Sequence, residues 1–205
     1  MTRVLQINAS LHGADAQSSR LASEFVAALQ RGPGPAGANG VAVTVRDLAL
    51  EPVPHLTAER LGALSTPASE RTVEQQRVFA QSDELIGELQ RADVVVLGLP
   101  MYNFGVPSTL KAYFDHVARA GVTFRYTASG PEGLLKGKKA FVFATRGGRY
   151  AGTDADLQSA YVRQFLGFIG IRDVEFVYAE GLALGDEPRS AAVAEAVSRI
   201  HQLAA

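Results

Sequence analysis

Short apolar runs alternate along the chain with longer segments that are apolar on one face only. The run Asp93–Gly98 is β-branched and continuously apolar, a pattern typical of a parallel strand buried on both faces. Similar runs of strand length cover residues 3–8, 41–45, 139–145 and 174–178. Because segments with helical spacing separate these runs, the pattern predicts an α/β fold, a doubly wound five-stranded parallel sheet with helices on both faces.

The predicted helices have apolar residues that recur every three or four positions. Leu21 and Phe25 mark such a face after the first strand, and Leu110 and Phe114 mark one after the third. Pro107 suits the first turn of the latter helix, where its missing N–H costs nothing. Further helices are predicted over 71–91, from residue 154, and over the last apolar positions, 193–203.

The chain has the length and composition of one domain. Its 205 residues are 47% hydrophobic, enough for one well-buried core, so we expect a single domain over 1–205. The Gly/Pro-rich segment 31–40 is too short to divide domains and predicts a mobile surface loop. Residues 121–137 predict an excursion with a short extended piece that forms part of a pocket wall.

Charge and cysteine content exclude several classes of function. A net charge of −1 gives no electrostatic case for binding nucleic acid or anionic membranes. The absence of cysteine excludes disulfides and thiolate catalysis, so any redox chemistry is assigned to a cofactor. The four histidines lack a metal-ligand spacing, and we expect no metal. No leader-like segment or long apolar run is present, and a cytoplasmic location is expected.

The loop Met101–Phe104 follows the third predicted strand, at the edge of the sheet where open α/β folds bind ligands. Tyr102 and Phe104 offer aromatic surface, and Asn103 offers an amide that can donate and accept. These groups suit a flat ring with polar edges, such as isoalloxazine. The alternative is that the two aromatic side chains only pack the loop onto the sheet.

The first loop, residues 10–19, is rich in hydroxyls and poor in charge. Backbone N–H groups at the following helix, its dipole, and the hydroxyls of Ser10, Ser18 and Ser19 could bind a terminal phosphate. Ser18 or Ser19 could instead serve as the helix N-cap. The chain has neither a P-loop nor a G-x-G-x-x-G after the first strand, which favours the single phosphate of FMN over a dinucleotide or triphosphate.

A third loop, Arg146–Tyr150, follows the fourth predicted strand. Gly147 and Gly148 allow close backbone approach to a ligand, and Arg146 and Arg149 could stabilise negative charge on the pyrimidine end of a reduced flavin. Alone, a Gly-Gly turn between strand and helix is ordinary turn chemistry. Three such loops at one edge of a sheet favour a flavin site.

Three stretches in order, Ser10 with Ala16–Ser18, Pro100–Lys111 and Thr145–Gly148, resemble the FMN-dependent NADH azoreductase family. Residues 114–117, 120–126 and 130–135 also resemble it, so the similarity covers nearly the whole chain. The resemblance implies a flavodoxin-like homodimer that binds FMN. The residues implied to bind it are Ser10, Ala16, Gln17, Ser18, Met101, Tyr102, Asn103, Phe104, Thr145, Arg146, Gly147 and Gly148.

The same resemblance implies a substrate pocket walled by aromatic side chains. Phe104, Tyr126 and, from the second subunit, Phe168 match the wall positions. The helical spacing around Phe168 is equally compatible with a role in the core. Tyr150 departs from the family, because many members carry histidine there.

The predicted activity is hydride transfer from NADH or NADPH through FMN to azo compounds or quinones. One shared pocket implies ping-pong kinetics, and no side chain is assigned as catalytic because the flavin carries the chemistry. The alternative is a flavodoxin-type electron carrier that docks with redox proteins, which a charge near zero and the 121–137 segment disfavour. A flavin-free regulator or scaffold requires all three ligand-like loops to be coincidental.

Overall fold

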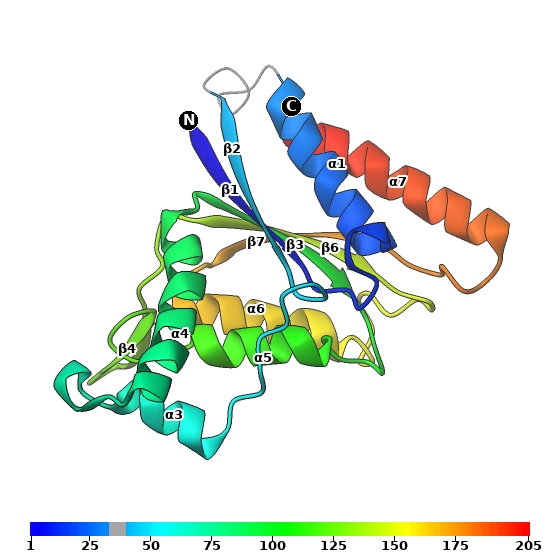
Figure 1. Ribbon diagram of the computed structural model, residues 1–205. Helices are drawn as coiled ribbons and strands as arrows, with labels where there is room; N and C mark the ends of the chain where they lie inside the picture. Colours follow the sequence, from blue (N-terminus) through cyan, green and yellow to red (C-terminus); the bar gives the residue numbers. More distant parts are fainter. Residues whose placement is uncertain (33–39) are drawn as a thin grey trace.

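The computed structural model describes residues 1–32 and 40–205, so most of the predicted surface loop at 31–40 lies outside the described residues (Figure 1). Five parallel strands form one sheet in the order β2-β1-β3-β6-β7. They are β2 (Val41–Asp47), β1 (Thr2–Asn8), β3 (Val94–Pro100), β6 (Lys139–Thr145) and β7 (Asp173–Ala179). The predicted five-stranded parallel sheet is confirmed.

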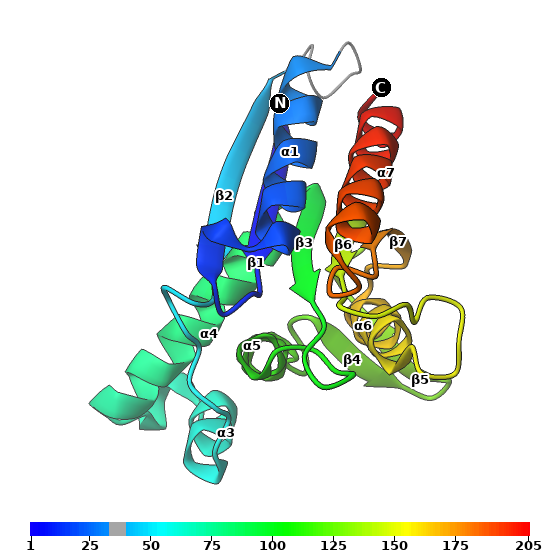
Figure 2. The ribbon, with the colours of Figure 1, turned by 90° about the vertical axis from the view of Figure 1, so that its right-hand side faces the viewer.

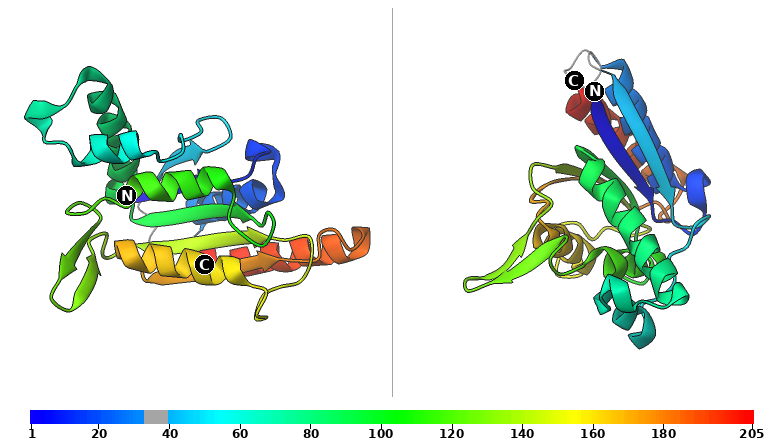
Figure 3. Two further views of the ribbon diagram at one scale, coloured as in Figure 1. Left: turned by 90° about the horizontal axis from the view of Figure 1, so that it is seen from below. Right: turned by 60° about the vertical axis from the view of Figure 1, so that its left-hand side comes forward.

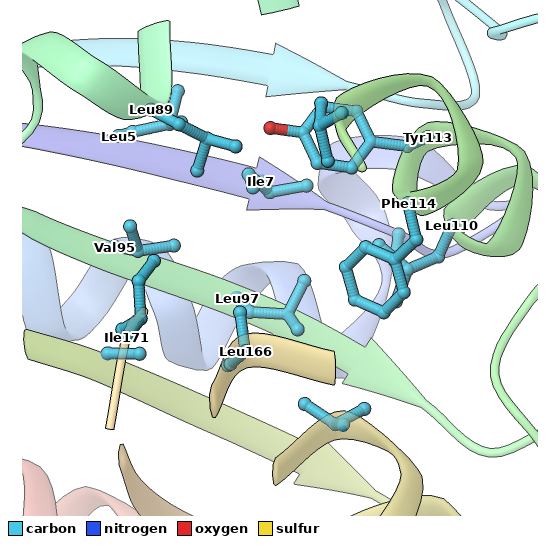
Figure 4. Packing of buried hydrophobic residues seen from close by; sticks show 14 of the residues in the cluster. Leu5, Ile7, Leu89, Val95, Leu97, Leu110, Tyr113, Phe114, Leu166 and Ile171 are labelled. Carbon is cyan, nitrogen blue, oxygen red and sulfur yellow. The ribbon is translucent and has the colours of Figure 1, made fainter. Parts of the chain in front are cut away.

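Helices cover both faces of this sheet, as predicted (Figures 1 and 2). On one face, α1 (Gln17–Arg31) and α7 (Asp186–Ala204) pack around Phe25, Phe141 and Phe143. On the other lie α4 (Val73–Arg91), α5 (Ser108–Val117) and α6 (Leu157–Ile169). Figure 4 shows side chains of this second core, with Leu5 beside Leu89 and Phe114 beside Leu110. Among the described residues, no helix is both long and apolar enough to cross a bilayer.

The segment between β2 and α4 contains one helix that the apolar pattern does not predict. This helix, α3 (Ala58–Ser65), begins where the Thr57 hydroxyl accepts a hydrogen bond from the Arg60 N–H at 3.2 Å. It buries only Ala63, so it has too few buried positions to produce a helical pattern. Two short 3-10 turns, η1 (Gly13–Asp15) and η2 (Ala68–Glu70), flank helices α1 and α4.

The excursion at 121–137 is an antiparallel hairpin of β4 (Phe124–Thr127) and β5 (Gly130–Gly133). Its base lies directly on the C-terminal end of α6: a Cβ on Gly133 would come within 2.1 Å of the Gly170 N atom. The Leu135 N–H also donates to the Ile169 oxygen at 2.9 Å. Figure 3 (left) places the hairpin at one end of the molecule and the loop after β3 at the other. Within one chain, the hairpin therefore does not wall that loop, contrary to the expectation from the sequence.

Candidate functional site

The loops after β1, β3 and β6 meet at the carboxyl edge of the sheet. Strand order reverses between β1 and β3, and such a switch point opens a crevice for ligands in open α/β sheets. The Ser10 hydroxyl lies 3.2 Å from the Tyr102 hydroxyl, which joins the first two loops. The Met101 N–H donates to the Thr145 oxygen at 3.0 Å, which joins the second and third. The structure therefore brings together the three loops that the sequence singles out.

The N-terminus of α1 has several polar groups free to bind an anion. Its N-cap is Ala16, which has no capping side chain, so neither Ser18 nor Ser19 serves as the cap. Both serines are buried, and their hydroxyls have no partner among the described residues. The N–H groups of Gln17, Ser18 and Ser19 likewise donate to no oxygen in residues 1–32 or 40–205. A phosphate at this helix end would satisfy these groups and the helix dipole together.

Gly98 on β3 allows α1 to begin at this position. A Cβ on Gly98 would lie 3.0 Å from the Ser18 oxygen and 3.2 Å from the Ser19 nitrogen. The backbone of the first helical turn thus lies directly against the strand, close to the switch point. This close approach fixes the height of the helix N-terminus above the sheet.

Replacing Ser18 by alanine should separate cofactor binding from stability. If Ser18 binds the phosphate of FMN, as the sequence leads us to expect, the FMN dissociation constant should rise about tenfold, because a hydrogen bond to a charged group is lost. The thermal midpoint of the FMN-free protein should stay the same or rise, since the hydroxyl has no partner to lose. Fluorescence titration with FMN and thermal unfolding measure the two effects, with the exposed Ser198→Ala on α7 as control. Unchanged FMN affinity combined with lower stability would assign the hydroxyl to the protein interior instead.

The loop after β3 is a tight turn with unusual backbone. Asn103 and Phe104 have φ of 48° and 65°, the left-handed region that non-glycine residues seldom adopt. Tyr102 and Gly105 exchange backbone hydrogen bonds of 3.2 and 3.0 Å across this turn. Two such residues in sequence store backbone strain, which typically marks a functional loop. In this turn Phe104 is 53% exposed. Its ring packs edge-on against the Tyr150 ring, with the ring centroids 5.7 Å apart.

The loop after β6 offers backbone N–H groups. The N–H groups of Gly147 and Gly148 donate to no oxygen of the described part of the chain, while their carbonyl oxygens accept from Ala183 and Gly181. The carbonyl bonds fix the loop and leave the N–H groups available. They can bind the electronegative edge of a ring, as the sequence leads us to expect.

Arg146 does not contribute its side chain to this edge, which corrects the expectation from the sequence. The guanidinium is 0% exposed and donates to Glu180 at 3.0 Å, to Asp156 at 2.7 Å and to the Ser159 hydroxyl at 2.7 Å. Its backbone N–H and oxygen are also occupied, by Ala179 and Leu182. Arg146 is therefore a structural cation that ties the loop to α6 and to the end of β7, whereas Arg149 is exposed.

The acidic partners of Arg146 organise the surrounding backbone. Burial acts to raise the pKa of Asp156, but hydrogen bonds from Arg146 and Ser159 outweigh it and hold that pKa below its ordinary value. The Glu180 carboxylate also accepts the N–H groups of Tyr150 and Ala151, both at 2.9 Å. One ion-pair network thus fixes both the third loop and the first turn of α6.

Tyr126 and Phe168 lie together, but far from Phe104 of the same chain. Phe124 contacts both, with ring-centroid distances of 5.4 Å to Tyr126 and 4.3 Å to Phe168. Phe168 is ten residues along α6 from Gln158, a separation of about 15 Å on a helix, and Gln158 is the residue that touches the β3 loop. Both aromatic residues therefore lie at the hairpin end of the molecule (Figure 3).

Sequence reasoning missed Gln158, Asp156 and Glu180. Gln158 is buried and donates to the oxygens of Pro100 and Gly105, on either side of the strained turn. No motif or spacing marks these residues, because each contacts its loop only after distant segments have packed. The N-cap position of Asp156, three residues before Ser159, is the one local signal available.

A parallel sheet of this strand order, with a helix N-terminus and a strained turn at its switch point, has the architecture of a flavodoxin-like protein. A family model described as "Flavodoxin-like fold" matches residues 2–204. The FMN-dependent NADH:quinone oxidoreductase 6 of Burkholderia lata is 56% identical over 196 residues, 96% of each chain. The FMN-dependent NADH:quinone oxidoreductase of Dechloromonas aromatica is 54% identical over 204 residues, 99% of this chain and 100% of that one.

Solved structures agree with these sequence relatives. An azoreductase from Bacillus anthracis superposes with a TM-score of 0.88 at 28% identity, over 100% of this chain and 99% of that one. An FMN-dependent NADH-azoreductase from the same species, in complex with FMN, gives a TM-score of 0.86 at 29% identity over 100% of both chains. The protein belongs to the flavodoxin-like family of FMN-dependent NADH:quinone oxidoreductases and azoreductases.

Proposed function

We propose that this protein uses bound FMN to carry hydride from NADH to quinones and azo compounds in a ping-pong reaction. The observation that carries the proposal is the pair of buried, unpartnered hydroxyls of Ser18 and Ser19 beside the free N–H groups at the start of α1. A core position normally pairs its polar atoms, so these groups indicate a ligand that supplies oxygen atoms. The family relationship supports FMN as that ligand.

The residues of the three loops have distinct tasks in this proposal. Ser18 and the helix N-terminus bind the phosphate, and the turn at Asn103 presents amide and backbone groups to the ring edge. The N–H groups of Gly147 and Gly148 stabilise negative charge at the far end of the ring. When bound, FMN supplies the hydride acceptor and donor, and the exposed Phe104 ring provides a flat surface for the acceptor molecule.

A homodimer is part of the proposal, because it completes the aromatic pocket. The loop that contains Phe104 and the hairpin that contains Tyr126 lie towards opposite ends of the face formed by α5 and α6 (Figure 3), and Tyr126 is 76% exposed. A cavity of about 560 Å³ lies on this face and is lined by residues that include Phe104, Leu157 and Tyr161. If two chains pack through this face about a two-fold axis perpendicular to it, the Phe104 end of one chain lies against the hairpin end of its partner. Tyr126 and Phe168 would then wall the partner's site, and sedimentation analysis should give the mass of two chains.

Anaerobic spectroscopy tests the redox cycle directly. Protein reconstituted with FMN should lose its visible flavin absorption when NADH is added and recover it when a quinone or azo dye follows. Initial rates at varied NADH and acceptor should give parallel double-reciprocal lines, the signature of a ping-pong reaction. If FMN binds but NADH leaves it oxidised while a reductase protein reduces it, the protein is an electron carrier. If no flavin binds, the proposed function fails.

A further inference from the structure

Gln158 links α6 to the strained turn after β3. Its side chain is 1% exposed, and its Nε2 donates to the Pro100 oxygen at 2.9 Å and to the Gly105 oxygen at 2.8 Å. Both acceptors are carbonyl oxygens, which settles the orientation of the amide. One side chain therefore holds the two ends of the segment that contains Asn103 and Phe104.

The turn requires such support because its own backbone is unfavourable. A non-glycine residue in the left-handed region costs roughly 1–2 kcal/mol, a cost that falls mainly on Phe104 because Asn103, which precedes it there, tolerates this region better. The only backbone bonds inside the turn join Tyr102 and Gly105. Without Gln158, other conformations of this segment become accessible at low cost.

The helix that carries Gln158 is itself firmly placed. Asp156 caps α6 by accepting the Ser159 N–H at 3.0 Å, and both residues are bound to the buried guanidinium of Arg146. Glu180 completes this network and holds the backbone of the third loop at Tyr150. The first turn of α6 thus connects the second and third loops of the site through rigid, buried groups.

We infer that Gln158 is a positioning residue that holds the turn at Asn103 and Phe104 in the conformation that binds the flavin ring. The inference rests on the proposed FMN site and extends it to a residue on α6 that supports the turn and also lines the cavity beside Phe104. Its physical basis is preorganisation: apparent affinity falls in proportion to the fraction of molecules whose turn is in the binding conformation.

Replacing Gln158 by methionine tests this role, because methionine keeps the length of the side chain and removes both donors. The matched control is Gln164→Met, which changes an exposed glutamine on the same helix. If loss of the two bonds reduces the competent turn to about one molecule in ten, the FMN dissociation constant rises about tenfold in Gln158→Met. The visible spectrum of bound FMN should also change, since the ring environment loosens. Gln164→Met should match the parent protein in both measurements.

A second substitution separates positioning from general destabilisation. Glycine adopts the left-handed region freely, so in a Phe104→Gly background the turn no longer depends on Gln158. We expect the change in FMN affinity caused by Gln158→Met to shrink to less than about threefold in that background. A purely structural role would weaken FMN binding by the same factor in both backgrounds.

The outcomes distinguish this inference from the proposed function. If the parent protein does not bind FMN, the proposed function fails. If it binds FMN and Gln158→Met binds it as tightly as Gln164→Met, the positioning role is wrong. Should Gln158→Met fail to fold, Gln158→Leu takes its place in the same comparison, and unfolding of both variants would show that Gln158 serves stability and overturn the inference.

Discussion

An Arg146→Met variant is expected to lose about 3–5 kcal/mol of the free energy of unfolding at neutral pH. The substitution removes a fully buried cation and leaves Asp156 and Glu180, which are 8% and 16% exposed, without their partner. Urea denaturation of the FMN-free protein measures the loss. Arg149→Met changes an exposed arginine of the same loop and should cost far less.

The Arg146→Met loss should also depend on pH in a defined direction. In the parent, the pKa of Asp156 is held below its ordinary value, so its stabilising contribution is present above pH about 4 and is lost as pH falls below that value. In the variant, burial of Asp156 remains without the compensating cation, and protonation then favours the folded state. The difference in stability between the two proteins should therefore be largest at neutral pH and shrink towards pH 4. A difference that stays constant with pH would contradict this explanation of the network.

A Gly133→Ala variant is expected to be destabilised by more than about 3 kcal/mol. Its Cβ would lie 2.1 Å from the Gly170 nitrogen and 2.4 Å from the Gly170 Cα, and these are backbone atoms that cannot move aside like a side chain. Gly170 has φ of 110°, which ends α6 at this position. The base of the hairpin must therefore separate from α6. Thermal unfolding should show a large fall in the midpoint.

The control for this change is Gly167→Ala, one turn earlier on α6, where an added Cβ meets nothing within 4 Å. Alanine is the better helix former, so this variant should be as stable as the parent or up to about 1 kcal/mol more stable. Equal stability of Gly133→Ala and Gly167→Ala would mean that the hairpin is not packed on α6 as the structure shows. If Gly133→Ala folds, quinone turnover should fall more than FMN affinity, because in the proposed dimer Tyr126 walls the partner's site and moves with the hairpin.

The sheet and most helices were predictable because their signals are local. Val94–Pro100 is buried along nearly its whole length, and a strand buried on both faces is apolar throughout. Helix α1 buries Leu21, Phe25 and Ala28 on one face, which gives the helical period. Helix α3 buries only Ala63 and shows no such period, and for this reason it was missed.

The sequence predicted the parts of the site that depend on where the backbone of each loop lies. Loops that follow parallel strands meet at one edge, so Ser10, Met101 and Gly147 had to lie near one another. The direction of a side chain depends on partners that are distant in sequence. Arg146 is turned inward by Glu180, 34 residues away, and Tyr126 is carried away from Phe104 by the contact between Gly133 and Gly170. Neither contact has a local signal.

The dependence of the third loop on Glu180 also sets an order of events during synthesis. The N-terminal turn of α1 is made early, but α1 packs against α7, which is made last, and its first turn lies against Gly98 on β3. The Tyr150 backbone is held by a carboxylate that follows the last strand of the sheet. A nascent chain that has not yet passed Glu180 therefore has the first two loops but not the complete cradle. We therefore expect flavin to bind late in translation, to chains in which β7 has already joined the sheet.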